Sequence, residues 1–453
     1  MRELKVRSLG LACAATALSA VAFLAPGTAS ATVVCGSGPS LDGNGSSLQA
    51  NAQTEVWSPG FDAICAGEGK STTVTYSSTS SGKGLKSWDI EPEPPTKKVP
   101  FKGFGAKNAF VGTDQPPNKE QEKELLAEGG GKVLSIPVMQ ASIALPIHLP
   151  TGCTATTGKK SKLQKRLALS DEVLQKIWSR EIKDWNEVAT YNDDALTGGA
   201  ACDVPIERVV RKEGSGSTSI LKKFLFEINN KTLSDGETWN KSAEGSSNTN
   251  WPEKSTDLKE AEKGSGVTAE VESVPGTIGY ANLNEVREKP AFGKAPNGSE
   301  FWPLLESKGK KYADPSTDEE QTTPANANCA AEEYISLNGV DKQEKFPPAS
   351  TEDVWNEVTA STVQKKSYPL CGFTYDLALT EYTLFSAASE GAEEDAEPTT
   401  APEVETLKNY LTFVLDEGQK LVGEKHDFYP LPEGKKGGNV LAVARAGLAK
   451  IGF

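Results

Sequence analysis

The chain has 453 residues and a formal net charge of −14 at pH 7, with 62 acidic against 48 basic side chains. This length allows two or three domains, and the acidic balance argues against a nucleic-acid-binding surface, which is basic. The only histidines are His148 and His426, so a catalytic triad or a histidine-rich metal site has few possible members.

The first 31 residues predict a secretory signal peptide. Basic residues precede an apolar core, and Ala-Ser-Ala at 29–31 predicts cleavage after Ala31. A lipid anchor on Cys35 is the alternative, although Cys35 follows Val34 and lies well beyond the apolar core. We therefore expect an extracytoplasmic protein, secreted or associated with the cell envelope. No later run has the ~18 uninterrupted apolar residues that a spanning helix needs.

Six cysteines remain after the predicted cleavage: Cys35, Cys65, Cys153, Cys202, Cys329 and Cys371. An even number outside the cytoplasm predicts disulfides. Of the roughly 15 possible connectivities, we favour sequential pairs, because each would link one local region. The spacing fits no zinc motif.

Strand-like and helix-like segments alternate along the chain, which is typical of α/β domains. We expect strands over 71–79, 108–114, 132–139, 143–150, 206–211 and 277–283. A helix is expected over 169–188, where Ser170 is the predicted N-cap, and others over 406–422 and 440–451. Three stretches rich in Gly, Ser, Pro and charged residues are predicted to be polar surface insertions: 236–266, 287–328 and 388–405.

Glycine and hydroxyl residues gather at several expected strand-to-helix turns. "GNGSSL" (43–48), "SSGKGLK" (80–86), "GSGSTS" (214–219) and "KGSGV" (263–267) share this composition, and "VGTDQP" (111–116) ends a strand with a lone acid. Such turns offer free backbone N–H groups and hydroxyls to an anion. Each turn alone also fits an ordinary capped helix start.

Enzyme motifs are absent from the sequence. "GSGSTS" has Ser219 where a dinucleotide fingerprint needs its third glycine, and neither the phosphate loop of nucleotide hydrolases nor a G-x-S-x-G elbow occurs. A catalytic pair of carboxylates stays an alternative, because acidic residues are plentiful. We predict no enzymatic activity and no cofactor.

The motifs, taken in order, resemble the extracytoplasmic phosphate-binding protein of phosphate-specific ABC importers. "GNGSSLQANAQTEVW", "VTYSSTSSGKGLKSW", "FVGTDQPPNKEQ", "LSDEVLQKIWSREIKDWNE", "VVRKEGSGSTSILKKFL" and "VPGTIGYANL" each resemble a motif of that family. The resemblance implies an α/β fold of two lobes, of the type II periplasmic-binding-protein class, with a two-stranded hinge and a ligand cleft. Lobe I would be 32–140 plus 286–453, and lobe II would be 141–285. The hinge crossings would fall near 139–146 and just after Leu283.

The resemblance also implies the phosphate-binding residues. They are Ser47, Leu48, Ser81, Asp114, Arg211, Ser215, Gly216 and Ser217. Glu213 stands where the family usually has an aspartate that braces the arginine, and its longer arm changes that geometry. Arg211 would offer a fixed fork to two oxygens. Asp114 would accept the proton that hydrogen phosphate carries and sulfate lacks.

The resulting prediction is a monomeric protein that binds inorganic phosphate and delivers it to the membrane permease of an ABC importer. A secreted phosphate or oxyanion scavenger, or a sensor without a transport role, is the alternative. A phosphatase that reuses the cleft and a binder of another oxyanion or of a small organic phosphate are further alternatives.

Overall fold

The computed structural model describes most of the chain beyond residue 32. The described residues are 33–88, 90, 108–118, 121–122, 132–156, 165–191, 196–229, 233, 238–239, 243, 248–252, 257–292, 297–307, 311–316, 334–336, 342–343, 355, 358–359, 368–382, 400–425, 427–433 and 440–453. The predicted signal peptide and Cys329 lie outside them.

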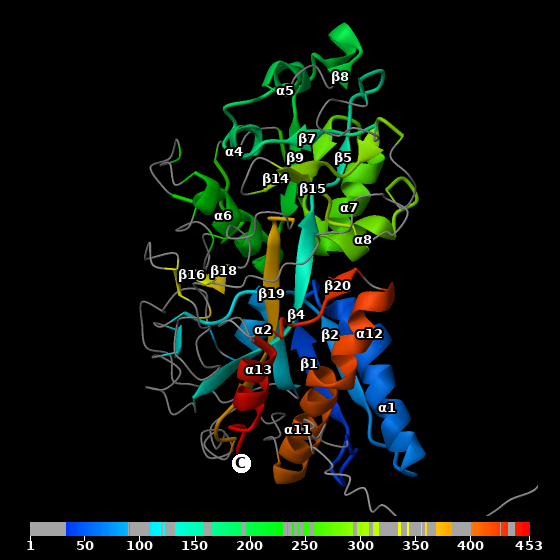
Figure 1. Cartoon of the computed structure of the whole chain (residues 1–453), viewed down its shortest axis with the longest axis vertical. Coiled ribbons are helices and arrows are strands. Elements are labelled where there is room, and N and C mark those ends of the chain that lie inside the picture. Colours follow the sequence, from blue (N-terminus) through cyan, green and yellow to red (C-terminus); the bar gives the residue numbers. More distant parts are fainter. Residues whose placement is uncertain are drawn as a thin grey trace, which may run out of the picture. The chain divides into compact units, whose positions relative to one another are not determined.

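A seven-stranded sheet is built mainly from the N-terminal part of the chain (Figure 1). Its order is β12-β4-β19-β3-β1-β2, with β20 paired to β4. The bounds are β1 (Leu41–Gly45), β2 (Val74–Ser78), β3 (Asn108–Thr113), β4 (Val133–Ala144), β12 (Ala281–Asn282), β19 (Cys371–Leu379) and β20 (Phe428–Tyr429). Strands β1, β2 and β3 are parallel, so their carboxyl ends share one edge.

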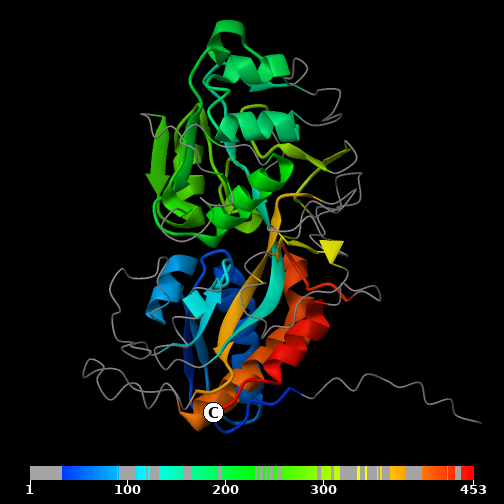
Figure 2. The ribbon, with the colours of Figure 1, turned by 90° about the vertical axis from the view of Figure 1, so that its left-hand side faces the viewer.

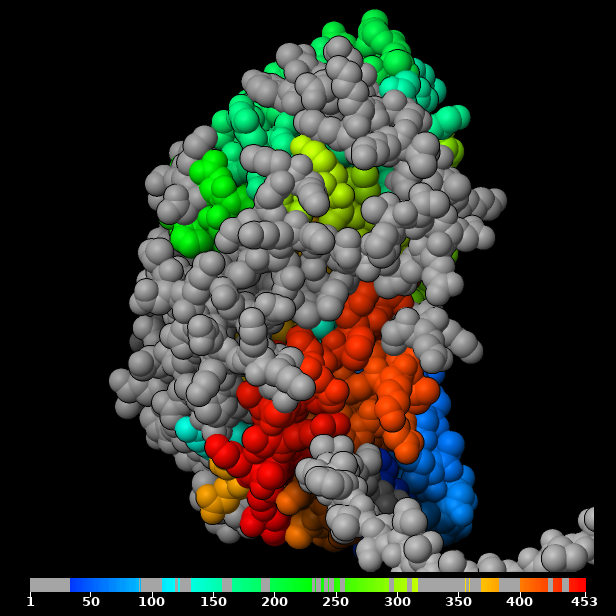
Figure 3. Space-filling model, viewed as in Figure 1, coloured from blue at the N-terminus to red at the C-terminus, as the bar shows by residue number. Residues whose placement is uncertain are grey.

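Helices cover this sheet because their apolar sides are buried against it. They are η1 (Ala52–Trp57), α1 (Ser58–Gly67), α2 (Ser81–Ser87), α11 (Ala401–Leu415), α12 (Glu417–Lys425) and α13 (Val440–Leu448). α1 packs against β2, α11 against β3 and α13 against β4. The three C-terminal helices, orange to red, form part of the face shown in Figure 3.

A five-stranded sheet has the order β10-β9-β11-β5-β13. Its strands are β5 (Ile147–His148), β9 (Glu207–Arg211), β10 (Leu258–Ala261), β11 (Thr277–Ile278) and β13 (Glu300–Phe301). Helices α6 (Gly216–Ile228) and α7 (Lys263–Ser273) follow β9 and β10 directly. β9 and β10 are parallel, so both helices begin at the same edge of this sheet.

Smaller elements complete the fold. They are β6 (Thr154–Ala155), β7 (Ala168–Leu169), α4 (Asp171–Trp178), α5 (Trp185–Tyr191), β8 (Leu196–Thr197), η2 (Gly199–Cys202), α8 (Leu283–Arg287), β14 (Leu304–Ser307), β15 (Lys311–Ala313), β16 (Tyr334–Ser336), β17 (Lys342–Gln343) and β18 (Val358–Thr359). The helix expected over 169–188 is therefore two helices. They separate at Arg180, which has φ 67° and whose buried guanidinium donates to the Ile206 carbonyl.

Two short crossings connect the sheets. β4 leads to β5 through 145–146, and β11 leads to β12 through 279–280, while β12 pairs antiparallel with β4. The second crossing was expected just after Leu283 and lies instead before Ala281, within the GYANL motif. β4 also pairs with β19 over most of its length, as Figure 2 shows.

The chain returns to the five-stranded sheet after α8. β13 pairs with β5, and β14 pairs with β7. Residues 300–307 therefore lie with elements of the expected lobe II, although we assigned 286–453 to lobe I. The rest of the lobe division stays a prediction.

The described parts of the predicted insertions are not merely polar surface. Trp239, Asn248 and Trp251 are buried in the 236–266 stretch, and Phe292 and Trp302 are buried in 287–328. Residues 401–405 form the start of α11. The composition of each stretch as a whole is polar, so it did not indicate that these few side chains are buried.

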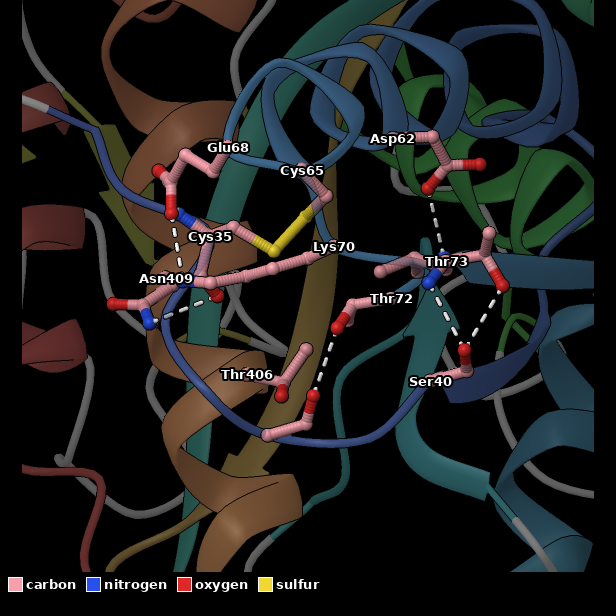
Figure 4. Close-up of a disulfide and its surroundings, with 12 residues drawn as sticks. Cys35, Ser40, Asp62, Cys65, Glu68, Lys70, Thr72, Thr73, Thr406 and Asn409 are labelled. Atoms are coloured by element: carbon pink, nitrogen blue, oxygen red, sulfur yellow. Dashed lines mark hydrogen bonds and ion pairs between the residues drawn. A yellow bond between two sulfur atoms is a disulfide. The ribbon is translucent and has the colours of Figure 1, made fainter.

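Two disulfides link neighbouring segments, Cys35–Cys65 and Cys153–Cys202, as sequential pairing predicted. Cys371 is also disulfide-bonded, and its partner lies outside the described residues. The segment around Cys35 is held further by the Glu68 carboxylate, which accepts from the Cys35 N–H at 2.8 Å, and by Asn409, which donates to the Cys35 carbonyl (Figure 4).

Candidate functional site

Three of the predicted residues gather at the carboxyl edge of β1, β2 and β3. Asp114 follows β3, Ser81 opens α2 shortly after β2, and Ser47 lies in the turn after β1. All three are buried. The parallel order of the strands explains this convergence, because it brings the turns that follow them to one place.

Asp114 is the centre of this group. Ser46 Oγ lies 2.7 Å from both carboxylate oxygens, and Ser81 Oγ donates to Oδ2 at 3.2 Å while accepting from the Asp114 N–H at 3.1 Å. Burial raises the pKa of Asp114, while the hydroxyls of Ser46, Thr374 and Ser81 and the charge of Arg211 lower it. The Asp114 carboxylate is thus a buried hydrogen-bond acceptor whose orientation is fixed by the neighbouring hydroxyls.

Sequence reasoning missed Ser46 and Thr374. Ser46 stands immediately before Ser47 in "GNGSSL", and the Leu48 N–H, predicted to serve the ligand, donates to Ser46 Oγ at 3.0 Å. The Ser47 carbonyl accepts from the Ala50 N–H. The two consecutive serines could have indicated that one of them bonds Asp114, but only the path of the backbone decides which one does.

The other predicted residues come from β9 and α6. Arg211 ends β9 with its side chain buried, Ser215 is the N-cap of α6, and Gly216 and Ser217 begin that helix. This is the strand–turn–helix expected for 206–226. Backbone N–H groups at the start of a 13-residue helix give a positive dipole end suited to an anion.

Arg211 is held in place by its neighbours. Its Nε donates to Glu213 Oε1 at 2.8 Å, and Nη2 donates to the same oxygen. Its backbone N–H donates to Tyr280 Oη at 3.0 Å, and that hydroxyl also bonds Thr218 Oγ1 at 2.6 Å. Glu213 therefore braces Arg211 in spite of its longer arm. The role of Tyr280 was not foreseen, although it lies in the recognised GYANL motif.

The hydroxyl of Ser215 is buried, and it is one of several buried serine hydroxyls that lack a partner among the described residues. Its backbone is fixed, because the Ser215 N–H donates to Asn248 Oδ1 at 2.9 Å and the Ser215 carbonyl accepts from Asn248 Nδ2 at 3.1 Å. Buried polar groups normally have partners, so this hydroxyl fits a role in holding a ligand.

The two groups of residues are in contact. A Cβ built on Gly216 would lie 2.3 Å from Asp114 Cβ, and the Gly82 N–H lies 3.4 Å from the Gly214 carbonyl oxygen. The structure therefore brings the turns that carry the predicted residues close together, although Ser46 rather than Ser47 bonds Asp114 and the Leu48 N–H is taken by Ser46 Oγ. A small pocket beside them is lined by Asp114, Pro116, Ser219, Ile220, Lys223, Phe224, Trp355, Val358, Cys371, Gly372, Phe373 and Tyr375.

The remaining glycine-rich turn, "KGSGV", has another use. The Lys263 N–H donates to Glu213 Oε1 at 2.9 Å, and the Ser265 N–H donates to Glu285 Oε1 at 3.1 Å. The first turn of α7 thus binds carboxylates of the protein itself. No three His, Cys, Asp or Glu side chains are grouped to hold a metal within the described part of the chain.

Comparison with known proteins identifies the superfamily to which the chain belongs. The family model of the PBP superfamily domain matches residues 27–417. The chain is 27% identical over 214 residues to phosphate-binding protein PstS 3 of Mycobacterium leprae, covering 47% of this chain and 48% of that protein. It is 24% identical over 364 residues to phosphate-binding protein PstS of Methanocaldococcus jannaschii, covering 77% and 79%. The match spans about half the length of the mycobacterial relatives.

Among solved structures, a phosphate-binding protein from Stenotrophomonas maltophilia has a TM-score of 0.56 to this chain. The sequence identity is 16%, and the match covers 90% of this chain and 93% of that protein. At this identity the likeness concerns the fold. The chain belongs to the PBP superfamily, and its fold is that of the two-lobe phosphate-binding proteins.

Proposed function

We propose that the chain binds hydrogen phosphate between Asp114 and the N-terminus of α6. One observation carries the proposal: a buried acceptor, a braced guanidinium and a buried hydroxyl without a partner among the described residues meet at facing sheet ends. These groups are Asp114, Arg211 and Ser215. A dehydrated oxyanion needs donors for its lone pairs, and helix amides, hydroxyls and an arginine fork supply them.

Asp114 would give the site its selectivity. At neutral pH, phosphate carries a proton that can be donated to a carboxylate, whereas sulfate would place a bare oxygen against it. Two negative oxygens without a shared proton repel each other in a buried site. The hydroxyls of Ser46 and Ser81 hold the carboxylate in the orientation this discrimination needs.

Delivery to the permease of a phosphate ABC importer is the physiological role we propose. The names of the relatives, phosphate-binding proteins PstS, support phosphate as the ligand, and the sequence resemblance supports the importer. The protein would act as a monomer and carry out no covalent chemistry. A phosphate-ester hydrolysis assay of the purified protein separates this role from that of a phosphatase.

The proposed location is extracytoplasmic, after removal of 1–31. The sulfur of Cys35 bonds Cys65, which argues against a thioether-linked lipid on Cys35. The disulfide therefore supports a protein that is not anchored through Cys35. This keeps a free phosphate scavenger or sensor as the second candidate. None of the described helices is long and apolar enough to cross a membrane.

Equilibrium dialysis with radiolabelled phosphate tests the proposed function. We expect the ligand-stripped protein to bind one phosphate, and Arg211→Ala to lose at least roughly a hundredfold in affinity, the scale of a buried charged hydrogen bond. Arg445→Ala is the control, since the Arg445 side chain is 47% exposed and pairs with Asp416. Unchanged affinity in a folded Arg211→Ala protein would remove Arg211 from the site.

A further inference from the structure

Asn248 is the residue that fixes the turn before α6. It is fully buried and bonds both the N–H and the carbonyl of Ser215. Its Nδ2 also donates to the Ala243 carbonyl at 2.8 Å. One side chain thus sets the backbone of the residue whose hydroxyl and following amides face the proposed anion.

Two buried cations hold the segment that carries Asn248. Lys222 Nζ donates to the Asn248 carbonyl at 2.9 Å and to the Asn250 carbonyl. Arg208 Nη2 donates to the Pro252 carbonyl at 2.9 Å. Both side chains are fully buried. Burying a charge costs free energy, so placing two of them on the carbonyls of one short segment points to a need for a fixed backbone there.

Aromatic rings complete this support. Lys222 Nζ lies 4.5 Å from the ring centroid of Trp251, within the range of a cation–π contact. Trp251 packs on Trp178 and on Tyr280, with ring centroids 5.1 and 5.8 Å apart. Tyr280 is the residue whose hydroxyl bonds the Arg211 N–H and Thr218. The 248–252 segment is therefore connected to both sides of the turn.

We propose that Asn248, held by Lys222 and Arg208 through the 248–252 segment, is a positioning residue of the anion site. It keeps Ser215 and the first amides of α6 in the geometry that an oxyanion requires, so that they need not be ordered on binding. The stretch 236–266, expected to be a polar insertion, then contributes to ligand affinity. The affinity part of this inference rests on the proposed function.

Hydrogen exchange of the ligand-free protein tests the positioning role without any ligand. The Ser215 amide is the reporter, resolved by NMR or by fragmentation mass spectrometry. We expect Asn248→Ala and Lys222→Met to speed its exchange at least tenfold. Asn229→Ala, at the other end of α6, and Lys420→Met, an exposed lysine of α12, are the matched controls and should exchange as the unmodified protein does.

Calorimetric titration with inorganic phosphate tests the consequence for affinity. Variants with a faster Ser215 amide should bind phosphate at least tenfold more weakly while keeping cooperative unfolding. If Asn248→Ala does not fold, Asn248→Asp keeps the acceptor for the Ser215 N–H and removes both donations.

Wild-type exchange in both Asn248→Ala and Lys222→Met would overturn the inference, as would wild-type phosphate affinity in a variant with a faster Ser215 amide. Failure of the unmodified protein to bind phosphate would instead overturn the proposed function, and the exchange result would still decide the role of Asn248.

Discussion

Gly216 and Asp114 are in direct contact, although they follow strands of two different sheets. A Cβ atom on Gly216 would lie 2.3 Å from Asp114 Cβ and 2.5 Å from Oδ2. Only a residue without a side chain allows the N-terminus of α6 to come this close to the carboxylate. Glycine at 216 is thus required by this close approach to Asp114.

Gly216→Ala is expected to weaken phosphate binding at least tenfold, because the methyl group would push α6 away from Asp114. Gly266→Ala is the matched control, since its nearest non-local atom is 3.7 Å from the added Cβ. Both changes should leave the protein folded, and alanine in a helix is favoured over glycine by up to about 1 kcal/mol. Equal phosphate affinities for the two variants would show that the Gly216–Asp114 contact does not belong to the binding state.

Asp114→Asn is expected to reduce discrimination between phosphate and sulfate by at least roughly a hundredfold, or about 2.7 kcal/mol. The amide removes the charge that repels sulfate and can donate to a bare oxygen. Competition of each anion against labelled phosphate measures the ratio. Asp42 is an exposed carboxylate at the start of β1, so Asp42→Asn is the control and should keep the wild-type ratio of phosphate to sulfate affinity. The same ratio in Asp114→Asn would place Asp114 outside the site.

Asp376 should make stability depend on pH. Burial raises its pKa to about 7, although hydrogen bonds from Gln53 and Gln49 lower it. The folded protein then keeps this proton at pH values where the unfolded chain, with a pKa near 3.8, has released it. The contribution of Asp376 to the free energy of unfolding is fully present below about pH 4 and is lost as pH rises through about 7. Its upper bound is about 4 kcal/mol.

Thermal unfolding of Asp376→Asn at several pH values checks this. Between pH 4 and 7, the Tm of the variant should fall less than the Tm of the unmodified protein. Glu285, whose pKa burial raises to about 7, would supply the remaining slope. Asp203→Asn, at an exposed position, is the control. A wild-type slope in Asp376→Asn would mean that Asp376 is ionised throughout.

The Cys35–Cys65 disulfide should be present in the purified protein. A peptide map without reduction is expected to contain a Cys35–Cys65 pair and no lipid on Cys35. The pair closes a loop of 30 residues, so replacing both cysteines with serine should cost about 3.6 kcal/mol of unfolding free energy. A lipid-modified Cys35 would contradict this pairing and favour an envelope-anchored protein.

Local patterns predicted much of this molecule. The strand and helix on either side of "GSGSTS", the strands that precede Ser81 and Asp114, and two of the disulfides follow from residue periodicity, turn composition and cysteine spacing. The ordered motifs then predicted which turns meet, and the structure brings their residues together. The brace between Glu213 and Arg211 is one contact that these motifs indicated and that the structure contains.

Other features depend on contacts between distant residues, which no local pattern encodes. Arg180 lies in the break between α4 and α5, and its side chain donates to the carbonyl of Ile206, 26 residues later. Asn248 bonds Ser215 across 33 residues, from a stretch whose composition predicts exposed surface. Ser46 and Ser47 have the same chemistry, and only the fold decides that Ser46 meets Asp114.

Calorimetric titration of the ligand-stripped mature protein, first with phosphate and then with sulfate, tests the central claim most directly. Micromolar or tighter binding of one phosphate with no sulfate binding is the predicted result, since Asp114 would read the proton that only phosphate carries. Equal binding of both anions would contradict that role and describe a general oxyanion binder. Binding of neither would mean that this protein shares the fold of the phosphate-binding proteins and takes another ligand.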